Sequence, residues 1–245
     1  MKKITLALAC TSILITPMVF AAGSSYITGN IQIHDRADFN GADTTSTLET
    51  GHTFDSGTTL LVEFDAIQLG QTTTSLNDKG ITISNASPAY ITIGVEQMFN
   101  LSNKLWVAAG YHQLLHDGKA TEYRPLVKIG YNFSNGISIS NRTRYQIQAY
   151  DNIAENGKDI TNDKIRFDNN IAYSFTDLAL NIKYNNVFYI NEGDTKRNSM
   201  EHELRATWTR NGVQPYVEYR NQQDSVKDTY GHNNNVLVMG ATYAF

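Results

Sequence analysis

The chain has 245 residues, of which 41% are hydrophobic, and its mean hydropathy is −0.36. Twenty Lys and Arg against 24 Asp and Glu give a net charge of −4, which excludes a basic nucleic-acid-binding protein. Beyond the N-terminus no stretch approaches the roughly eighteen apolar residues of a transmembrane helix, which excludes a helical membrane protein.

The first 21 residues have the pattern of a signal peptide. Two lysines precede an apolar run at 4–20, and Val19 and Ala21 place small side chains where a signal peptidase acts. We expect cleavage after Ala21 or one residue later, which leaves a single domain at 22–245. The mature domain would carry 18 basic and 24 acidic residues, a net charge of about −6, and it would lack Cys10. Disulfides and thiolate chemistry are therefore not expected.

Apolar and polar residues alternate along almost the whole mature chain. Val127 and Ile129, for example, alternate with Arg124 and Lys128. A period of two is typical of strands that present two different faces, and a helical period is absent from the sequence. The pattern predicts an all-β fold with strands near 25–36, 46–54, 59–66, 89–99, 105–112, 123–133, 137–148, 164–175, 180–188, 203–208, 213–220 and 236–245.

The connections between these strands fall into two classes. Tight turns are expected at 55–57, 101–103, 134–136, 176–177 and 211–212. Longer polar connections are expected near 38–45, 70–86, 115–120, 151–162, 191–198 and 222–232. Six long connections alternating with five tight ones give a transmembrane antiparallel up-and-down β-barrel of about 12 strands. Ten or fourteen strands are the alternatives, because Asp35 and His52 would face lipid on the first two strands.

Aromatic residues mark the end of the barrel that carries the tight turns. They lie shortly before those turns and predict a girdle at the periplasmic membrane surface: Phe54, Phe99, Phe133, Phe175 and Trp208. The chain ends at Phe245, after apolar residues at every second position. This ending resembles the signal that outer-membrane assembly machinery reads. We therefore expect a barrel in the bacterial outer membrane, in contact with lipid and lipopolysaccharide.

Seven basic residues fall on the non-lipid face of four consecutive strands. Because neighbouring strands lie about 4.8 Å apart, their side chains form one patch on the lumen wall. Guanidinium groups present a planar fork to carboxylates, so the patch predicts guidance of acidic solutes. Pairing with Asp168, Glu122 or Glu203 is the alternative. The seven are Arg124, Lys128, Arg142, Arg144, Lys164, Arg166 and Lys183.

The facing wall is expected to be acidic, with Glu63, Asp65, Glu96, Glu201, Glu203 and Glu218 directed inward. Two walls of opposite sign predict a transverse field like that of general porins. Inward aromatic residues would either offer flat surfaces to sugar rings or only fill space. They are Tyr90, Trp106, Tyr150, Tyr189 and Tyr216.

Four short motifs resemble the oligogalacturonate-specific porin family, which also includes a channel for N-acetylneuraminate. The motifs lie at 121–128 (TEYRPLVK), 142–145 (RTRY), 163–168 (DKIRFD) and 215–219 (PYVEY). The resemblance implies a monomeric twelve-stranded barrel with a narrow basic pore, through which acidic sugars and oligosaccharides diffuse passively. The acidic wall departs from the family pattern, in which basic rows line facing sides.

The sequence thus predicts an outer-membrane channel for small acidic saccharides, in which the loop at 70–86 folds over or into the mouth. A non-specific small porin and a non-conducting structural or adhesive barrel are the alternatives. A rim hydrolase built on His112, His116 and Asp117 is the enzymatic alternative. Two histidines and one aspartate near a loop are more often solvated, so we predict no catalytic residues, metal or cofactor, and no nucleic-acid partner.

Overall fold

The computed structural model describes residues 23–36, 42–70, 74–76, 82–84, 86–226 and 233–245. The predicted signal peptide lies outside these residues. Within them, no helix is long and apolar enough to cross a membrane.

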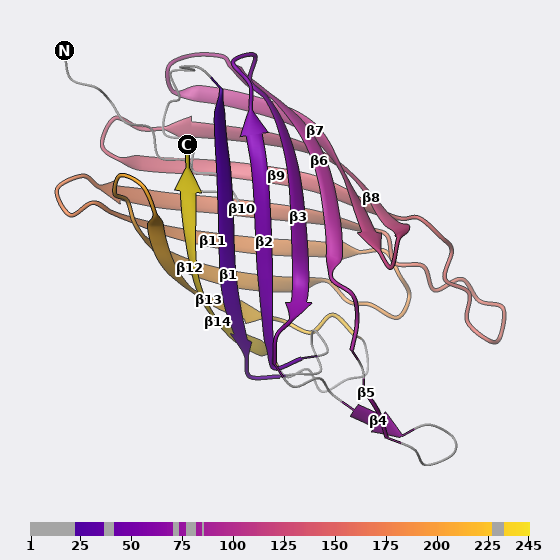
Figure 1. The fold of residues 1–245 in the computed structure, drawn as a ribbon. Helices are drawn as coiled ribbons and strands as arrows, with labels where there is room; N and C mark the ends of the chain where they lie inside the picture. Colours follow the sequence, from indigo (N-terminus) through magenta and orange to yellow (C-terminus); the bar gives the residue numbers. More distant parts are fainter. Residues whose placement is uncertain (1–22, 37–41, 71–73, 77–81, 85, 227–232) are drawn as a thin grey trace.

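Twelve antiparallel strands form a closed barrel (Figure 1). Each strand pairs with its neighbours in the chain, and the last strand pairs with the first. The prediction of a twelve-stranded all-β barrel is therefore confirmed. The strands are β1 (Ser24–His34), β2 (Thr44–Thr53), β3 (Thr58–Gln68), β6 (Tyr90–Asn100), β7 (Leu105–His116), β8 (Lys119–Asn132), β9 (Ile137–Gln148), β10 (Lys164–Phe175), β11 (Leu180–Asn191), β12 (Ser199–Trp208), β13 (Gln214–Gln222) and β14 (Asn234–Ala244).

Hydrogen bonds hold both ends of the seam between β1 and β14. At one end, the backbone N–H of Ser25 donates to the carbonyl of Phe245 at 2.8 Å, and the N–H of Phe245 donates back at 2.9 Å. At the other end, the backbone and side-chain N–H groups of Asn235 donate to Asp35 at 2.7 and 2.6 Å. These bonds to its carboxylate hold the pKa of Asp35 below its usual range. The closed seam leaves the barrel without a free edge.

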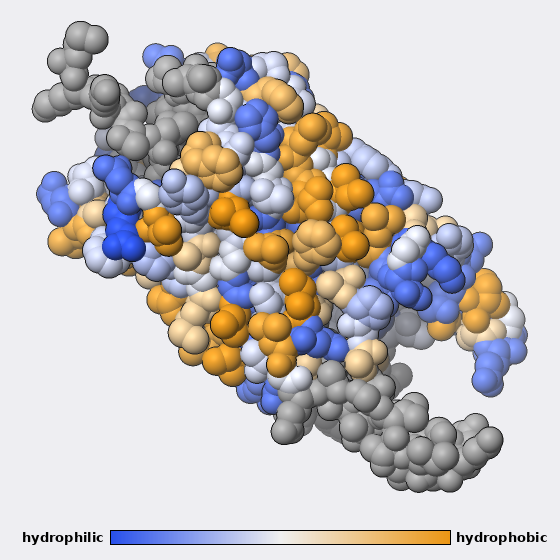
Figure 2. Space-filling model, viewed as in Figure 1, coloured by the Kyte–Doolittle hydropathy of each residue, from blue (hydrophilic) through white to orange (hydrophobic). Residues whose placement is uncertain are grey.

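Side chains alternate between an apolar outside and a polar inside. Ile129 and Leu204 point outward with 51% and 53% of their surface exposed, whereas Asp168 and Asn185 point inward and are buried. Figure 2 shows apolar side chains spread over the outer wall of the barrel. An apolar exterior around a polar interior is the pattern of a barrel that spans a membrane.

The predicted aromatic girdle lies at the short-turn end, and its members are exposed. His52 belongs to the same end: its Nδ1 lies 2.9 Å from the Ser25 hydroxyl, and its ring packs edge-on against Phe54 at 4.6 Å. Asp35 follows the last residue of β1. Both polar residues therefore lie at strand ends, which explains why they do not disturb the first two strands.

One connection differs from its prediction. The segment at 115–120 was expected to form a long loop, but β7 and β8 continue to a two-residue turn of Asp117 and Gly118. Both residues have positive φ angles, 49° and 71°. Asp and Gly tolerate this conformation, and its twist matches that of a tight hairpin. The count of twelve strands is unaffected, because the turn still joins two neighbouring strands.

The long connection between β3 and β6 contains a small hairpin. β4 (Thr74–Leu76) pairs with β5 (Thr82–Ser84), and the hairpin extends from the long-loop end of the barrel (Figure 1). The rest of 71–85 lies outside the described residues, as do the side chains of the hairpin. Constriction of the mouth by this loop stays a prediction.

Candidate functional site

The barrel encloses a cavity of about 770 Å³ lined mainly by polar and charged side chains. The basic residues of its lining are Arg36, Arg124, Lys128, Arg142, Arg144, Lys164, Arg166, Lys196, Arg205 and Arg220. The acidic residues are Glu49, Glu63, Asp65, Glu96, Asp168, Glu201, Glu203 and Asp224. Because the two signs nearly balance, the placement of the charges decides what the cavity attracts.

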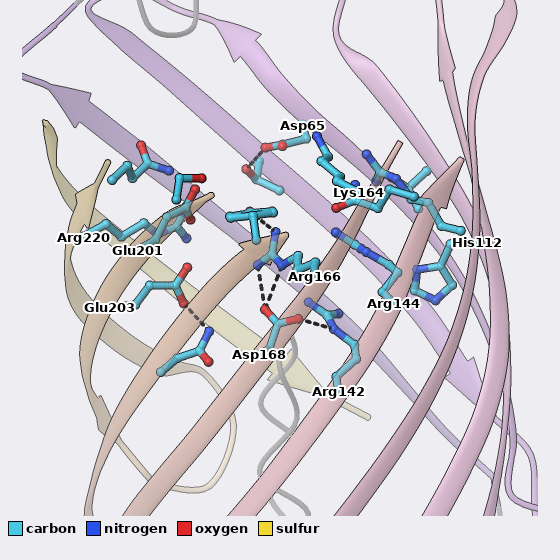
Figure 3. Close-up of a pocket in the computed structure, with 18 of the residues that line it drawn as sticks. Asp65, His112, Arg142, Arg144, Lys164, Arg166, Asp168, Glu201, Glu203 and Arg220 are labelled. Atoms are coloured by element: carbon cyan, nitrogen blue, oxygen red, sulfur yellow. Dashed lines mark hydrogen bonds and ion pairs between the residues drawn. The ribbon is translucent and has the colours of Figure 1, made fainter. Parts of the chain in front are cut away.

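Six of the seven predicted basic residues line the cavity from three neighbouring strands, and Figure 3 labels four of them, Arg142, Arg144, Lys164 and Arg166. The six, called the basic wall below, are Arg124 and Lys128 on β8, Arg142 and Arg144 on β9, and Lys164 and Arg166 on β10. Arg144 lies directly opposite Arg166, and Arg142 directly opposite Lys128, in the pairing of neighbouring strands. Adjacent like charges at this spacing repel one another.

Asp168 on β10 relieves part of this repulsion. Arg142 Nε and Arg166 Nη2 reach its two oxygens at 2.8 and 2.7 Å, and its side chain has no exposed surface. Arg166 also donates to the hydroxyl of Tyr189 at 2.9 Å. One buried carboxylate therefore holds two guanidinium groups at the lumen surface.

Two further carboxylates serve the other members of the basic wall. Arg124 Nη2 lies 2.7 Å from Glu122, and Lys164 Nζ lies 3.7 Å from the same carboxylate. Lys128 Nζ lies 2.5 Å from Glu96 on β6. Six basic groups thus share three carboxylates, and the wall keeps an excess of positive charge.

Arg144 is the member of the basic wall that has no carboxylate of its own. It exposes 7% of its surface, and its Nε–H has no hydrogen-bond partner among the described residues. Basic residues surround it: Arg166 is its partner on β10, and Arg142 lies two residues away on the same strand. A buried donor without a partner is costly, and an anion in the cavity would satisfy it.

Acidic side chains occupy β2 and β3. Glu49 and Glu63 are directly opposite each other, and their carboxyl groups are in hydrogen-bonding contact. Tyr26 donates to Glu49 at 2.8 Å, and Thr47 donates to Asp65 at 2.6 Å. These three acidic residues form no ion pair within the described part of the chain, in contrast to Glu96, Glu122 and Asp168.

Comparison with known proteins shows which family the chain belongs to. The sequence matches the family described as oligogalacturonate-specific porin protein (KdgM) over residues 23–245. The chain belongs to this family. The NanC porin structure is similar with a TM-score of 0.70 at 14% identity, covering 89% of this chain and 98% of that one. The KdgM porin has a TM-score of 0.62 at 15% identity, covering 90% and 99%. An outer-membrane channel from Pseudomonas putida F1 has a TM-score of 0.58 at 12% identity, covering 94% and 98%.

No curated protein sequence matches the chain. The family match nevertheless spans the whole described barrel. This porin is therefore a channel of the bacterial outer membrane, and its transmembrane strands enclose the charged cavity.

Aromatic rings of this porin lie against the lumen wall. Tyr26, Trp106 and Tyr216 each pair with a glycine on the neighbouring strand, and a Cβ on that glycine would collide with the ring. Glycine therefore makes room for rings that lie along the wall. Tyr189 is an aromatic residue of the cavity lining, with Arg166 at 5.3 Å from its ring centroid, whereas Tyr150 is exposed outside it.

Two of the predicted charged residues lie outside the cavity lining. Lys183 is buried on β11. Glu218 is held between Arg205 Nε and Arg220 Nε, at 2.5 Å from each. Glu96 lines the cavity but forms an ion pair with Lys128. It therefore neutralises part of the charge of the basic wall and does not belong to a separate acidic wall.

Glu49 and several loop residues line the cavity although they were not predicted to do so. The alternation of Thr45, Thr47 and Glu49 on β2 could have placed Glu49 inward. Lys196 and residues 223–226 line the cavity from two long connections. No sequence period marks loop residues, so only the closed barrel brings them to the lumen.

The histidines do not form the rim site that was considered. His112 is buried, with its Nε2 2.9 Å from Glu96, whereas His116 lies 2.9 Å from the Ser87 hydroxyl and stacks on Tyr90. Asp117 is exposed in the turn. Within the described residues, no group of three His, Cys, Asp or Glu is arranged to hold a metal ion.

Proposed function

We propose that this porin lets small acidic saccharides diffuse passively through the outer membrane, guided by the basic wall. The observation that carries the proposal is the sharing of three carboxylates among six lumen-facing basic groups. An excess of positive charge on the wall of a lumen enclosed by protein attracts carboxylates more strongly than it would in bulk water. A relative, the KdgM porin, has also been solved in complex with disordered oligogalacturonate. The mechanism contains no catalytic step.

Planar-bilayer recording under a salt gradient tests this proposal. We expect Arg142→Gln, Arg144→Gln and Arg166→Gln together to lower the anion-to-cation permeability ratio. One charge at contact distance is worth about 1 kcal/mol in water, so the ratio should fall by at least about fivefold. Block by galacturonate oligomers or sialic acid should weaken in parallel.

The triple variant would leave Asp168 buried without its partners, so a second variant adds Asp168→Asn. The matched control removes three exposed charges outside the cavity, with Lys104→Gln, Lys119→Gln and Lys158→Gln. An unchanged ratio in both lumen variants would remove the basic wall from the mechanism. Cation-selective or unblocked current in the unchanged protein would favour a non-specific porin, and absence of current would favour a structural barrel.

We also infer that the barrel works as a monomer and enters the membrane through assembly machinery that reads the strand ending at Phe245. Closure of the seam supports the first inference, because a barrel without a free edge needs no partner to complete its sheet. The aromatic terminus supports the second. Analytical ultracentrifugation of the detergent-solubilised barrel tests the oligomeric state, and a dimer would contradict it.

A further inference from the structure

Two walls of opposite charge face each other across the cavity. β2 and β10 are six strands apart in either direction around the barrel, so they lie on opposite sides of the lumen. β10 belongs to the basic wall, and β2 carries Glu49. Figure 3 shows Arg142, Arg144 and Arg166 on one side of the cavity and Glu201 and Glu203 on another.

The basic side contains a group that lacks a partner. Arg144 is more than nine-tenths buried, lines the cavity and has an unsatisfied Nε–H within the described residues. The other basic groups of this wall already contact Glu96, Glu122 or Asp168. A carboxylate of a solute is therefore expected to form its strongest charge-assisted hydrogen bond with Arg144.

The acidic side contains two carboxyl groups that form no ion pair within the described residues. Glu49 and Glu63 contact each other, and in the part of the chain that the structure describes neither forms an ion pair with a basic residue. Arg144 interacts electrostatically with Glu63, although no ion pair joins them. The two sites thus line one lumen.

We propose that this lumen preferentially binds saccharides that carry both a carboxylate and an ammonium group, such as amino-uronic acids. The inference rests on the proposed function and narrows its class of solute. A purely anionic sugar is attracted by Arg144 but gains no favourable contact from Glu49 and Glu63. An ammonium group on the same sugar gains such a contact, because it can donate hydrogen bonds to the oxygens of the two carboxyl groups.

The experiment compares two sugars that differ in one group, on unchanged protein. Single-channel block is measured with 2-amino-2-deoxygalacturonate and with its N-acetyl derivative, which keeps the carboxylate and loses the positive charge. We expect the amino form to block at a concentration about fivefold lower, which corresponds to one charge contact of about 1 kcal/mol. Galactosamine, which has the amine alone, should block more weakly than the amino acid form.

Substitutions test which residues cause the difference in block between the two sugars. Glu49→Gln with Glu63→Gln should abolish the advantage of the amino form, and Arg144→Gln should weaken block by both sugars. The matched control, Asp151→Asn with Glu155→Gln, removes two negative charges from an exposed loop and should keep the advantage. Heat-modifiable migration in gels checks that each variant is folded.

The outcomes separate the two proposals. Equal block by both sugars, or an advantage that survives the double glutamate substitution, would overturn the preference for mixed charge. If galacturonate still blocks in that case, the proposed function stands. If an open channel is blocked by none of these acidic sugars, the proposed function itself fails.

Discussion

Asp168 shows how one residue can set the field of the whole lumen. Its carboxylate is fully buried and bonds to Arg142 and Arg166 from two neighbouring strands. Without it, two guanidinium groups would face each other and Arg144 with nothing to balance them. The residue therefore stabilises the basic wall while lowering its net charge.

Asp168→Asn separates these two effects. We expect a lower free energy of unfolding, by about 3–5 kcal/mol, because a buried ion cluster loses its central partner. We also expect greater anion selectivity, because two positive charges become uncompensated. Urea unfolding in lipid vesicles and reversal potentials measure the two quantities. Asn169→Asp, which adds a carboxylate on the outward face, is the positional control; a gain in anion selectivity there would contradict the argument.

Sequence reasoning predicted which side chains face the lumen, because alternation along a strand is a local property. It predicted less well how they pair. Lys128 and Glu96 lie on β8 and β6, with β7 between them, and they meet because Ala108 and Gly110 on β7 are small. That contact depends on the register of three strands, which no single segment specifies.

Strand pairs with one aromatic and one glycine are a repeated element of this barrel. Trp106 on β7 lies opposite Gly130 on β8, and Tyr216 on β13 lies opposite Gly240 on β14. In both pairs the ring occupies the space that a Cβ on the glycine would take. The rings therefore extend along the wall, and the lumen keeps room for solute.

Gly130→Ala tests this role. The added methyl group meets the Trp106 ring, so the ring must turn into the lumen or strain the wall. We expect lower single-channel conductance and a loss of about 1–3 kcal/mol of stability. The control is Gly29→Ala, whose Cβ would meet its neighbours only at 3.6 Å or more. Equal conductance in the two variants would show that the glycine is not needed to keep the ring on the wall.

Element boundaries were harder to predict than elements. The β7–β8 connection was predicted to be a long loop, because the polar stretch at 116–119 gives no sign that the strands continue. Pairing of Leu115 with Ala120 and of His116 with Lys119 extends the hairpin to its turn. Tertiary pairing thus overrides local polarity at that end of the barrel.

At the scale of the whole molecule, the alternation of long and short connections was sufficient to predict twelve strands. The same pattern could not reveal the cavity, because its lining includes loop residues and side chains from strands on opposite sides of the barrel. The charge of each wall follows from strand order around a closed sheet.

The C-terminal residue provides a test at this scale. Phe245 bonds to Ser25 through its backbone, and its exposed ring stacks on Tyr243 at 5.6 Å. Phe245→Ala keeps the backbone bonds, so a severalfold loss of folded barrel in the outer membrane would reflect poorer recognition during assembly. Phe99→Ala removes another exposed ring, from the girdle at the same end of the barrel, and should cost little. Similar losses in both variants would contradict a special role for the terminus.

The seam between β1 and β14 also determines when the barrel can form. The Thr242 hydroxyl donates to Thr28 across 214 positions of the sequence, and every pair along the seam spans a similar separation. Closing such a long loop is slow compared with forming neighbouring hairpins. A chain still lacking its last strand has two unpaired edges, which invite aggregation. The closed barrel therefore cannot form until the last strand has been made and can pair with the first.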